Sequence, residues 1–187
     1  YEDVEEFDTK PFTFIVGKGK AGLITKSIRE CPHFLMGGST GMGKSTAFKL
    51  MLYSFLKNTP PEQLHLCLLD LKRGVEVADF KKFPNVEIAK TESDALNTLK
   101  AVVKEMSERY DMISKKGLKS VDPKRDKIPI IVVAVDEASV IFGASGRSSE
   151  KRKMANEARS LCEEIGKLGR AAGIHLVLAT QRATKTS

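Results

Sequence analysis

Residues 38–45 read Gly38-Ser39-Thr40-Gly41-Met42-Gly43-Lys44-Ser45, and this stretch decides the fold. It matches the pattern G-x-x-x-x-G-K-[ST] at every fixed position. A short apolar run, 34–36, precedes it, and a mostly apolar helical segment, 44–57, follows it. Glycines let a backbone wrap closely around phosphates, and the N–H groups at a helix start attract an anion. The strand–loop–helix context therefore favours a phosphate-binding loop over a chance glycine-rich turn.

This loop predicts that the chain binds Mg²⁺ and ATP. Lys44 is placed to reach the β- and γ-phosphates, and the Ser45 hydroxyl to ligate the Mg²⁺ ion. We expect the nucleotide to contact Gly38, Ser39, Thr40, Gly41, Met42, Gly43, Lys44, Ser45 and Thr46.

A second acidic group is needed to hold the metal, and the segment IPIIVVAVDE (128–137) supplies it. Residues 130–135 form a continuous apolar run, as expected of a parallel strand covered on both faces. Asp136 follows that strand and is predicted to hold Mg²⁺, while Glu137 is predicted to act as general base toward the attacking water. An acidic pair after a strand is often only a solvated loop, but the phosphate loop upstream favours the catalytic interpretation.

Strands and helices alternate along the rest of the chain, which predicts an α/β fold with a mainly parallel sheet flanked by helices. Thr91 and Asp94 fit a helix-start capping pair, and Gly117 and Gly173 fit helix ends. We expect strands at 12–16, 23–28, 34–36, 64–69, 86–89, 130–135 and 174–179. The loops include 71–85 and a flexible, basic segment beginning with 143–149. Residues 1–30 are predicted to be a strand-hairpin lead-in, and 31–187 a P-loop ATPase core.

The composition fits a globular domain with a polyanionic partner. The 187 residues carry a formal net charge of +7, which suits nucleic acid or an acidic membrane surface, although a merely soluble basic domain is the alternative. The three cysteines are odd in number and far apart, which indicates a reducing cytosol. Because the chain begins with Tyr1 and stops a few residues past an apparent strand, we expect it to be one domain of a longer protein, truncated at its C-terminus.

Five segments resemble motifs of the FtsK/SpoIIIE family of DNA translocases, in the family's order. They are PHFLMGGSTGMGKS (32–45), LLDLKRGVEVADF (68–80), EMSERYDMIS (105–114), VAVDEAS (133–139) and GRAAGIHLVLATQR (169–182). Asp70 and Lys72 stand at the matching positions of the second segment. The resemblance covers about 12–182, nearly the whole chain.

The resemblance implies a RecA-like motor that assembles into a ring, with a hexamer as the expected size, and moves double-stranded DNA through its pore. It implies that Gln181 is a polar sensor of the γ-phosphate or the attacking water. Arg109 resembles the finger arginine that reaches a neighbour's nucleotide, and we expect it at the edge of the buried helix stripe, extending past the surface. Arg170 is the rival candidate for this role, and Arg182 contacts either DNA or its own domain.

Departures from the family pattern suggest a divergent member, such as the coupling ATPase of a conjugative element, rather than the chromosome-segregation protein. Leu71 and Ala183 stand where many members have proline. The basic residues Arg147, Lys151, Arg152 and Lys153 either face DNA phosphates in the pore or form a solvated surface. The alternatives are an EssC-type ATPase of type VII protein secretion and a slow nucleotide switch. We expect a cytoplasmic domain whose parent is tethered to the cell membrane outside this segment.

Overall fold

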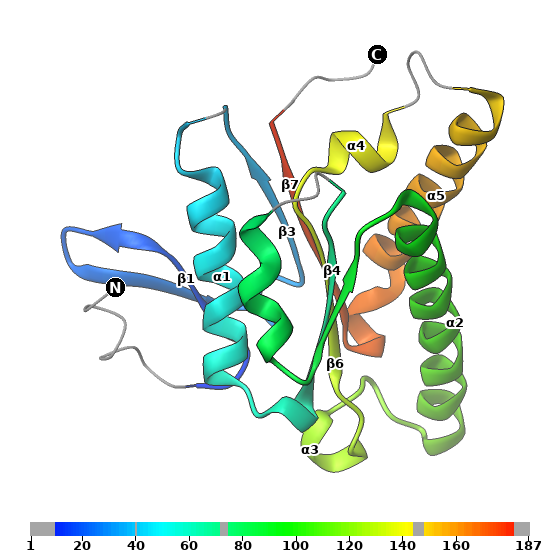
Figure 1. The fold of residues 1–187 in the computed structure, drawn as a ribbon. Helices are drawn as coiled ribbons and strands as arrows, with labels where there is room; N and C mark the ends of the chain where they lie inside the picture. The colour runs from blue at the N-terminus through cyan, green and yellow to red at the C-terminus, as the bar shows by residue number, and fades with distance from the viewer. Residues whose placement is uncertain (1–9, 40, 72–74, 144–147, 182–187) are drawn as a thin grey trace.

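The computed structural model describes residues 10–39, 41–71, 75–143 and 148–181. Five strands form one parallel sheet in the order β3-β7-β6-β4-β5 (Figure 1). They are β3 (His33–Gly37), β4 (Leu64–Leu69), β5 (Val86–Ala89), β6 (Ile130–Val135) and β7 (Ile174–Thr180). All five strands start at one edge of the sheet, the amino edge, and end at the other, the carboxyl edge. The predicted α/β fold with a parallel sheet is confirmed.

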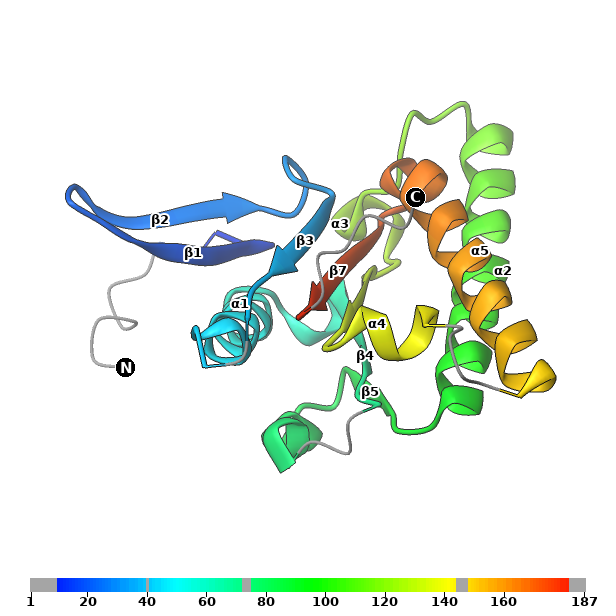
Figure 2. The same cartoon turned by 90° about the horizontal axis from the view of Figure 1, so that it is seen from above.

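Helices cover both faces of this sheet, as Figure 2 shows from above. Helix α1 (Lys44–Asn58) lies on one face, and α2 (Glu92–Lys116) and α5 (Ser149–Ala172) lie side by side on the other. Side chains alternate along a strand, so β6 sends Ile131, Val133 and Val135 to the α2/α5 face. Its other residues, Ile130, Val132 and Ala134, pack in the core with α1. Burial on both faces explains why β6 is apolar throughout.

A separate antiparallel hairpin precedes the sheet. It consists of β1 (Thr13–Gly19) and β2 (Gly22–Ser27) and projects to one side of the molecule (Figure 2). Its base is anchored, because Phe14 and Ile28 are fully buried in the core that contains α1. The N–H of Phe12 also donates to Thr59 Oγ1 at 2.9 Å. The hairpin therefore shares a hydrophobic core with the sheet, and a boundary near residue 30 stays a prediction.

The predicted helix signals act as expected. Thr91 caps α2, and its Oγ1 accepts a hydrogen bond from the Asp94 N–H at 3.0 Å. Gly117 ends α2 and Gly173 ends α5, both with left-handed backbone. None of the helices in the described ranges is long and apolar enough to span a bilayer.

The structure contains short helices that the sequence analysis did not predict. Residues 71–85 were expected to form a loop, yet η3 (Val75–Lys82) is a 3₁₀-helix held by Phe80, whose fully buried ring lies 4.6 Å from that of Tyr53. Of the segment 143–149, which was predicted to be flexible, residues 144–147 lie outside the described residues, and Ser148 caps α5, which begins at Ser149. The short helices η2 (Pro61–Gln63), α3 (Pro123–Asp126) and α4 (Ala138–Phe142) lie in segments for which no element was predicted. Elements of one or two turns show too little periodicity to be recognised in sequence.

Candidate active site

The carboxyl edge gathers the predicted site residues from three neighbouring strands. In the sheet, β7 lies between β3 and β6. The phosphate loop follows β3, Gln181 follows β7, and the Asp136–Glu137 pair follows β6 (Figure 1). Ligands of open α/β sheets bind beyond the carboxyl ends of the strands, so this edge is the candidate site.

The phosphate loop has the backbone that its glycines make possible. Gly41 and Gly43 have φ of 83° and 78°, which a side-chain-bearing residue rarely adopts. Helix α1 begins at Lys44, its N-cap Gly43 provides no side-chain cap, and its first turn has no acidic residue. A helix start of this kind favours an external anion. The Gly38 N–H donates to Thr180 O at 3.3 Å and ties the loop to β7. Thr40 lies outside the described residues.

Lys44 and Asp136 connect the phosphate loop to the end of β6. The Lys44 side chain is buried, and its Nζ donates to the Asp136 carbonyl oxygen at 3.0 Å. The same Nζ lies 3.9 Å from Asp136 Oδ1. Ser45, the predicted metal ligand, directly follows Lys44 in the first turn of α1, and Thr46 comes next. The cation and the carboxylate that the sequence analysis assigned to phosphate and metal are therefore brought together across 92 positions of sequence.

Glu137 is buried and held by the end of β7. Glu137 is only 5% exposed. Oε1 accepts hydrogen bonds from Ser139 Oγ at 2.7 Å, Thr180 Oγ1 at 2.9 Å and the Gln181 N–H at 3.1 Å. Oε2 lies 3.2 Å from the same N–H. The backbone of Gln181, the predicted sensor, thus orients Glu137, the predicted base. Thr180 and Ser139 were not among the predicted site residues. The sequence pointed to them only through their position inside the recognised motifs 169–182 and 133–139.

Asp70 brings a further carboxylate to the carboxyl edge. It follows β4, which pairs with β6, and the Asp136 N–H donates to Leu69 O at 3.4 Å. Asp70 is only 1% exposed, and its N–H donates to Ala89 O at 2.9 Å. Asp70 and Asp136 therefore end adjacent strands, with Asp136 on the strand nearer to the phosphate loop.

The model of the FtsK/SpoIIIE family matches residues 3–154. The chain belongs to the FtsK/SpoIIIE family. It is 32% identical over 186 residues to the DNA translocase FtsK of Helicobacter pylori strain J99, covering 93% of this chain and 21% of the relative. FtsK of Lactiplantibacillus plantarum is 30% identical over 191 residues, and the match covers 23% of that protein. The chain thus spans about a fifth of the length of these relatives.

Two solved structures of proteins with other names share the fold of this chain. The pCW3 conjugation coupling protein TcpA, in a monomer form with ATPγS, has a TM-score of 0.85 at 24% identity over 96% of this chain and 51% of that one. EssC of Geobacillus thermodenitrificans has a TM-score of 0.77 at 20% identity over 93% of this chain and 34% of that one. The predicted FtsK/SpoIIIE resemblance is confirmed, and these likenesses establish the fold.

Arg109 is not where the sequence analysis expected it. We predicted an arginine at the edge of the buried stripe that extends past the surface, and this placement is wrong. Arg109 is only 2% exposed; its Nη1 donates to Ala172 O at 2.9 Å and its Nε to Glu105 Oε1 at 2.9 Å. Burial lowers the pKa of the guanidinium, and Glu105 partly counteracts this shift. The cause is α5, which packs against α2 and whose last residue, Ala172, offers its carbonyl oxygen to Arg109.

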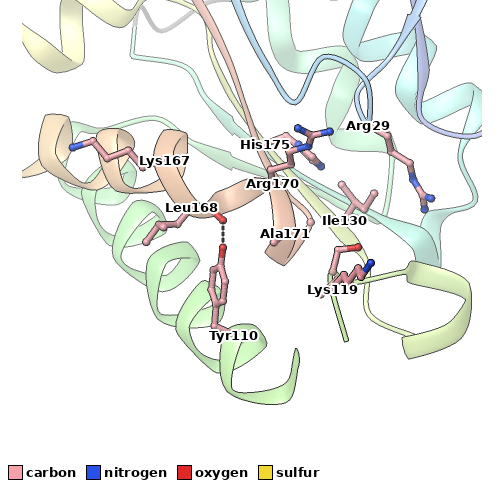
Figure 3. A pocket seen from close by; sticks show the side chains of 12 residues that line it. Arg29, Tyr110, Lys119, Ile130, Lys167, Leu168, Arg170, Ala171 and His175 are labelled. Carbon is pink, nitrogen blue, oxygen red and sulfur yellow. Dashed lines mark hydrogen bonds between the residues drawn. The ribbon is translucent and has the colours of Figure 1, made fainter. Parts of the chain in front are cut away.

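Arg170, in contrast, is exposed at the amino edge. It lines a cavity of about 410 Å³ together with Arg29, Lys119 and His175 (Figure 3). Tyr110, on the wall, donates its hydroxyl proton to Leu168 O at 2.7 Å. This cavity lies at the opposite end of the sheet from the phosphate loop, so Arg170 cannot serve the nucleotide of its own subunit.

Proposed function

We propose that this chain binds Mg²⁺-ATP and hydrolyses it as the motor domain of a translocase that moves double-stranded DNA through an oligomeric ring. The observation that carries the proposal is the meeting of Lys44, Asp136 and Glu137 at the carboxyl edge of the sheet, where Lys44 Nζ contacts Asp136 and Glu137 is the next residue. Lys44 holds the β- and γ-phosphates, and Ser45 and Asp136 hold the metal, which neutralises phosphate charge when it is bound.

In this proposal Glu137 accepts the proton of the attacking water. The hydrogen bonds from Thr180 and Gln181 orient its carboxylate. The side chain of Gln181 contacts the γ-phosphate or the water, while its N–H holds the base.

The surface charge supports DNA as the translocated polymer. Lys151, Arg152 and Lys153 are exposed near the start of α5, after Glu150 and at the same end of the molecule as the phosphate loop (Figure 1). Cations at a helix N-terminus are disfavoured by the helix dipole, so their presence there favours an external polyanion. Relatives at 30–32% identity carry the name DNA translocase. Arg147 lies outside the described residues.

The deciding experiment is the steady-state ATPase rate of the full-length parent with and without duplex DNA. We expect DNA to stimulate turnover, and its binding to weaken steeply with salt because phosphate contacts release counterions. Replacing Lys151, Arg152 and Lys153 with glutamine should reduce stimulation. The matched control replaces the exposed lysines Lys57, Lys104 and Lys115 and removes the same charge. Hydrolysis that no DNA stimulates would favour protein export by an EssC-type motor, and negligible hydrolysis a nucleotide switch.

Ring assembly makes a second, separable test. In a ring, the amino edge of one subunit can approach the nucleotide of the next, and we propose Arg170 as the residue that acts there. Arg170→Ala should then bind ATP normally but lose turnover. Mixing it with Lys44→Ala subunits should restore part of the activity, because one subunit donates Arg170 and its neighbour the intact phosphate loop. A mixture that co-assembles and stays inactive would contradict this role.

A further inference from the structure

His65, Cys67 and Glu87 form a cluster that the proposed motor function does not use. His65 and Cys67 lie two residues apart on β4 and so point to the same face of the sheet. Glu87 is the register partner of Cys67 on β5. One donor atom from each, an imidazole nitrogen, a thiol sulfur and a carboxylate oxygen, all lie within 4.8 Å of one another. It is the one such group found within the described ranges.

The geometry points to a site for Zn²⁺ or a chemically similar divalent cation, bound by His65 Nε2, Cys67 Sγ and a Glu87 carboxylate oxygen. Zinc bonds of about 2.0–2.3 Å in a tetrahedron place donor atoms roughly 3.3–3.8 Å apart. His65 Nε2 and Glu87 Oε2 already lie 3.5 Å apart. Closing the other separations requires side-chain rotations, and the paired strands supply a fixed backbone for them.

The donor types select the class of metal. Nitrogen, sulfur and oxygen together suit Zn²⁺, whereas Mg²⁺ and Ca²⁺ prefer oxygen ligands alone. Three protein ligands leave a fourth tetrahedral position for water. His65 and Glu87 have side chains 39% and 52% exposed, so a metal ion can enter from solvent, while the buried Cys67 forms the floor.

A neighbouring residue holds one ligand in place. Thr98, on α2, donates its hydroxyl proton to Glu87 Oε1 at 2.8 Å. This bond leaves Oε2 as the oxygen nearest His65 and fixes the carboxylate in the way that outer partners orient metal ligands. A bound cation would join β4 to β5, which is an edge strand of only four residues.

Cobalt titration under reducing conditions, without nucleotide, tests the site. Co²⁺ bound to a thiolate in a tetrahedral site gives a near-ultraviolet charge-transfer band and visible absorption. We expect one equivalent of Co²⁺ to give both signals and Zn²⁺ to abolish them. Zn²⁺ should also raise the thermal unfolding midpoint, since it binds the folded state.

Four variants make the assignment specific. Cys67→Ala should lose the charge-transfer band, and His65→Gln and Glu87→Gln should weaken cobalt affinity at least ~10-fold. The matched control is Cys162→Ala, because Cys162 is a second buried cysteine of the same core and burial raises the pKa of either thiol to about 12. It should keep the wild-type signals. His65 and Glu87 are half-exposed, so their glutamine variants should fold and can test cobalt binding even if Cys67→Ala fails to fold.

Three results would overturn the proposal. The first is a wild-type chain that shows no charge-transfer band at saturating Co²⁺, which would leave His65 and Glu87 as an ion pair only. The second is a band that persists in Cys67→Ala. The third is unchanged affinity in both His65→Gln and Glu87→Gln.

Discussion

The two edges of the central sheet use their charged residues in opposite ways. At the carboxyl edge, Lys44, Asp136 and Glu137 converge on the place where a nucleotide would bind. At the amino edge, Arg109 and His175 are just as buried but bond to backbone carbonyl oxygens of their own domain, those of Ala172 and Pro32. Burial of a charged or titratable group therefore does not by itself mark a catalytic residue. Its position relative to the phosphate loop decides, and substitutions at the two edges should separate activity from stability.

The largest effect is expected from Lys44→Ala. Removing the cation that faces the β- and γ-phosphates should weaken Mg²⁺-ATP binding by ~10²-fold or more, measured by calorimetry. The variant also removes the hydrogen bond from Nζ to the Asp136 carbonyl oxygen, so the thermal midpoint is measured in parallel to show that the variant is folded. Lys57→Ala, an exposed position on the same helix, is the control. Unchanged affinity in Lys44→Ala would remove the basis of the phosphate-loop assignment.

Glu137→Gln should separate binding from chemistry at the same edge. The amide keeps the size of the side chain but cannot accept the proton of water, so turnover should drop by ~10²-fold while ATP affinity is retained. Single-turnover hydrolysis in the assembled ring measures the first quantity and calorimetry the second. If binding and turnover fall together, Glu137 holds the metal or the fold instead.

Arg109→Ala tests the amino edge and should act on stability. It deletes hydrogen bonds to Glu105 and Ala172 from a residue only 2% exposed, which should cost about 2–4 kcal/mol in the free energy of unfolding. Urea denaturation measures this loss. The exposed Arg170→Ala should change stability by no more than about 0.5 kcal/mol. Equal losses for the two variants would contradict the contrast between a structural and a surface arginine.

The smallest effect concerns pH and His175. Burial is the largest cause that lowers its pKa from 6.5 to about 4, although its contact with Pro32 O opposes the shift. The unfolded chain therefore binds the proton more readily. The contribution of His175 to the free energy of unfolding is fully present above about pH 6.5 and is lost as the pH falls toward about 4. We expect a loss of about 1 kcal/mol between about pH 6.5 and 5.5.

Urea denaturation across this pH window measures the effect, and His175→Gln should flatten it. His33, whose pKa burial also lowers, adds in the same direction. A stability that rises as the pH falls through this window would show that His175 is charged in the folded state and would contradict its placement.

The α/β fold, the bounds of β4, β5 and β6, and a loop between β3 and α1 with left-handed Gly41 and Gly43 could be predicted from local sequence patterns. These are set by local patterns: apolar runs, glycines at left-handed positions, and a lysine and serine at fixed spacing. The hydrogen-bond partners of Arg109 and Glu137 depend on the tertiary structure. Arg109 is held by Ala172, 63 residues away, and Glu137 by Thr180, 43 residues away. No local pattern specifies which distant carbonyl or hydroxyl will face a side chain, because packing of α5 and β7 against the sheet sets that geometry.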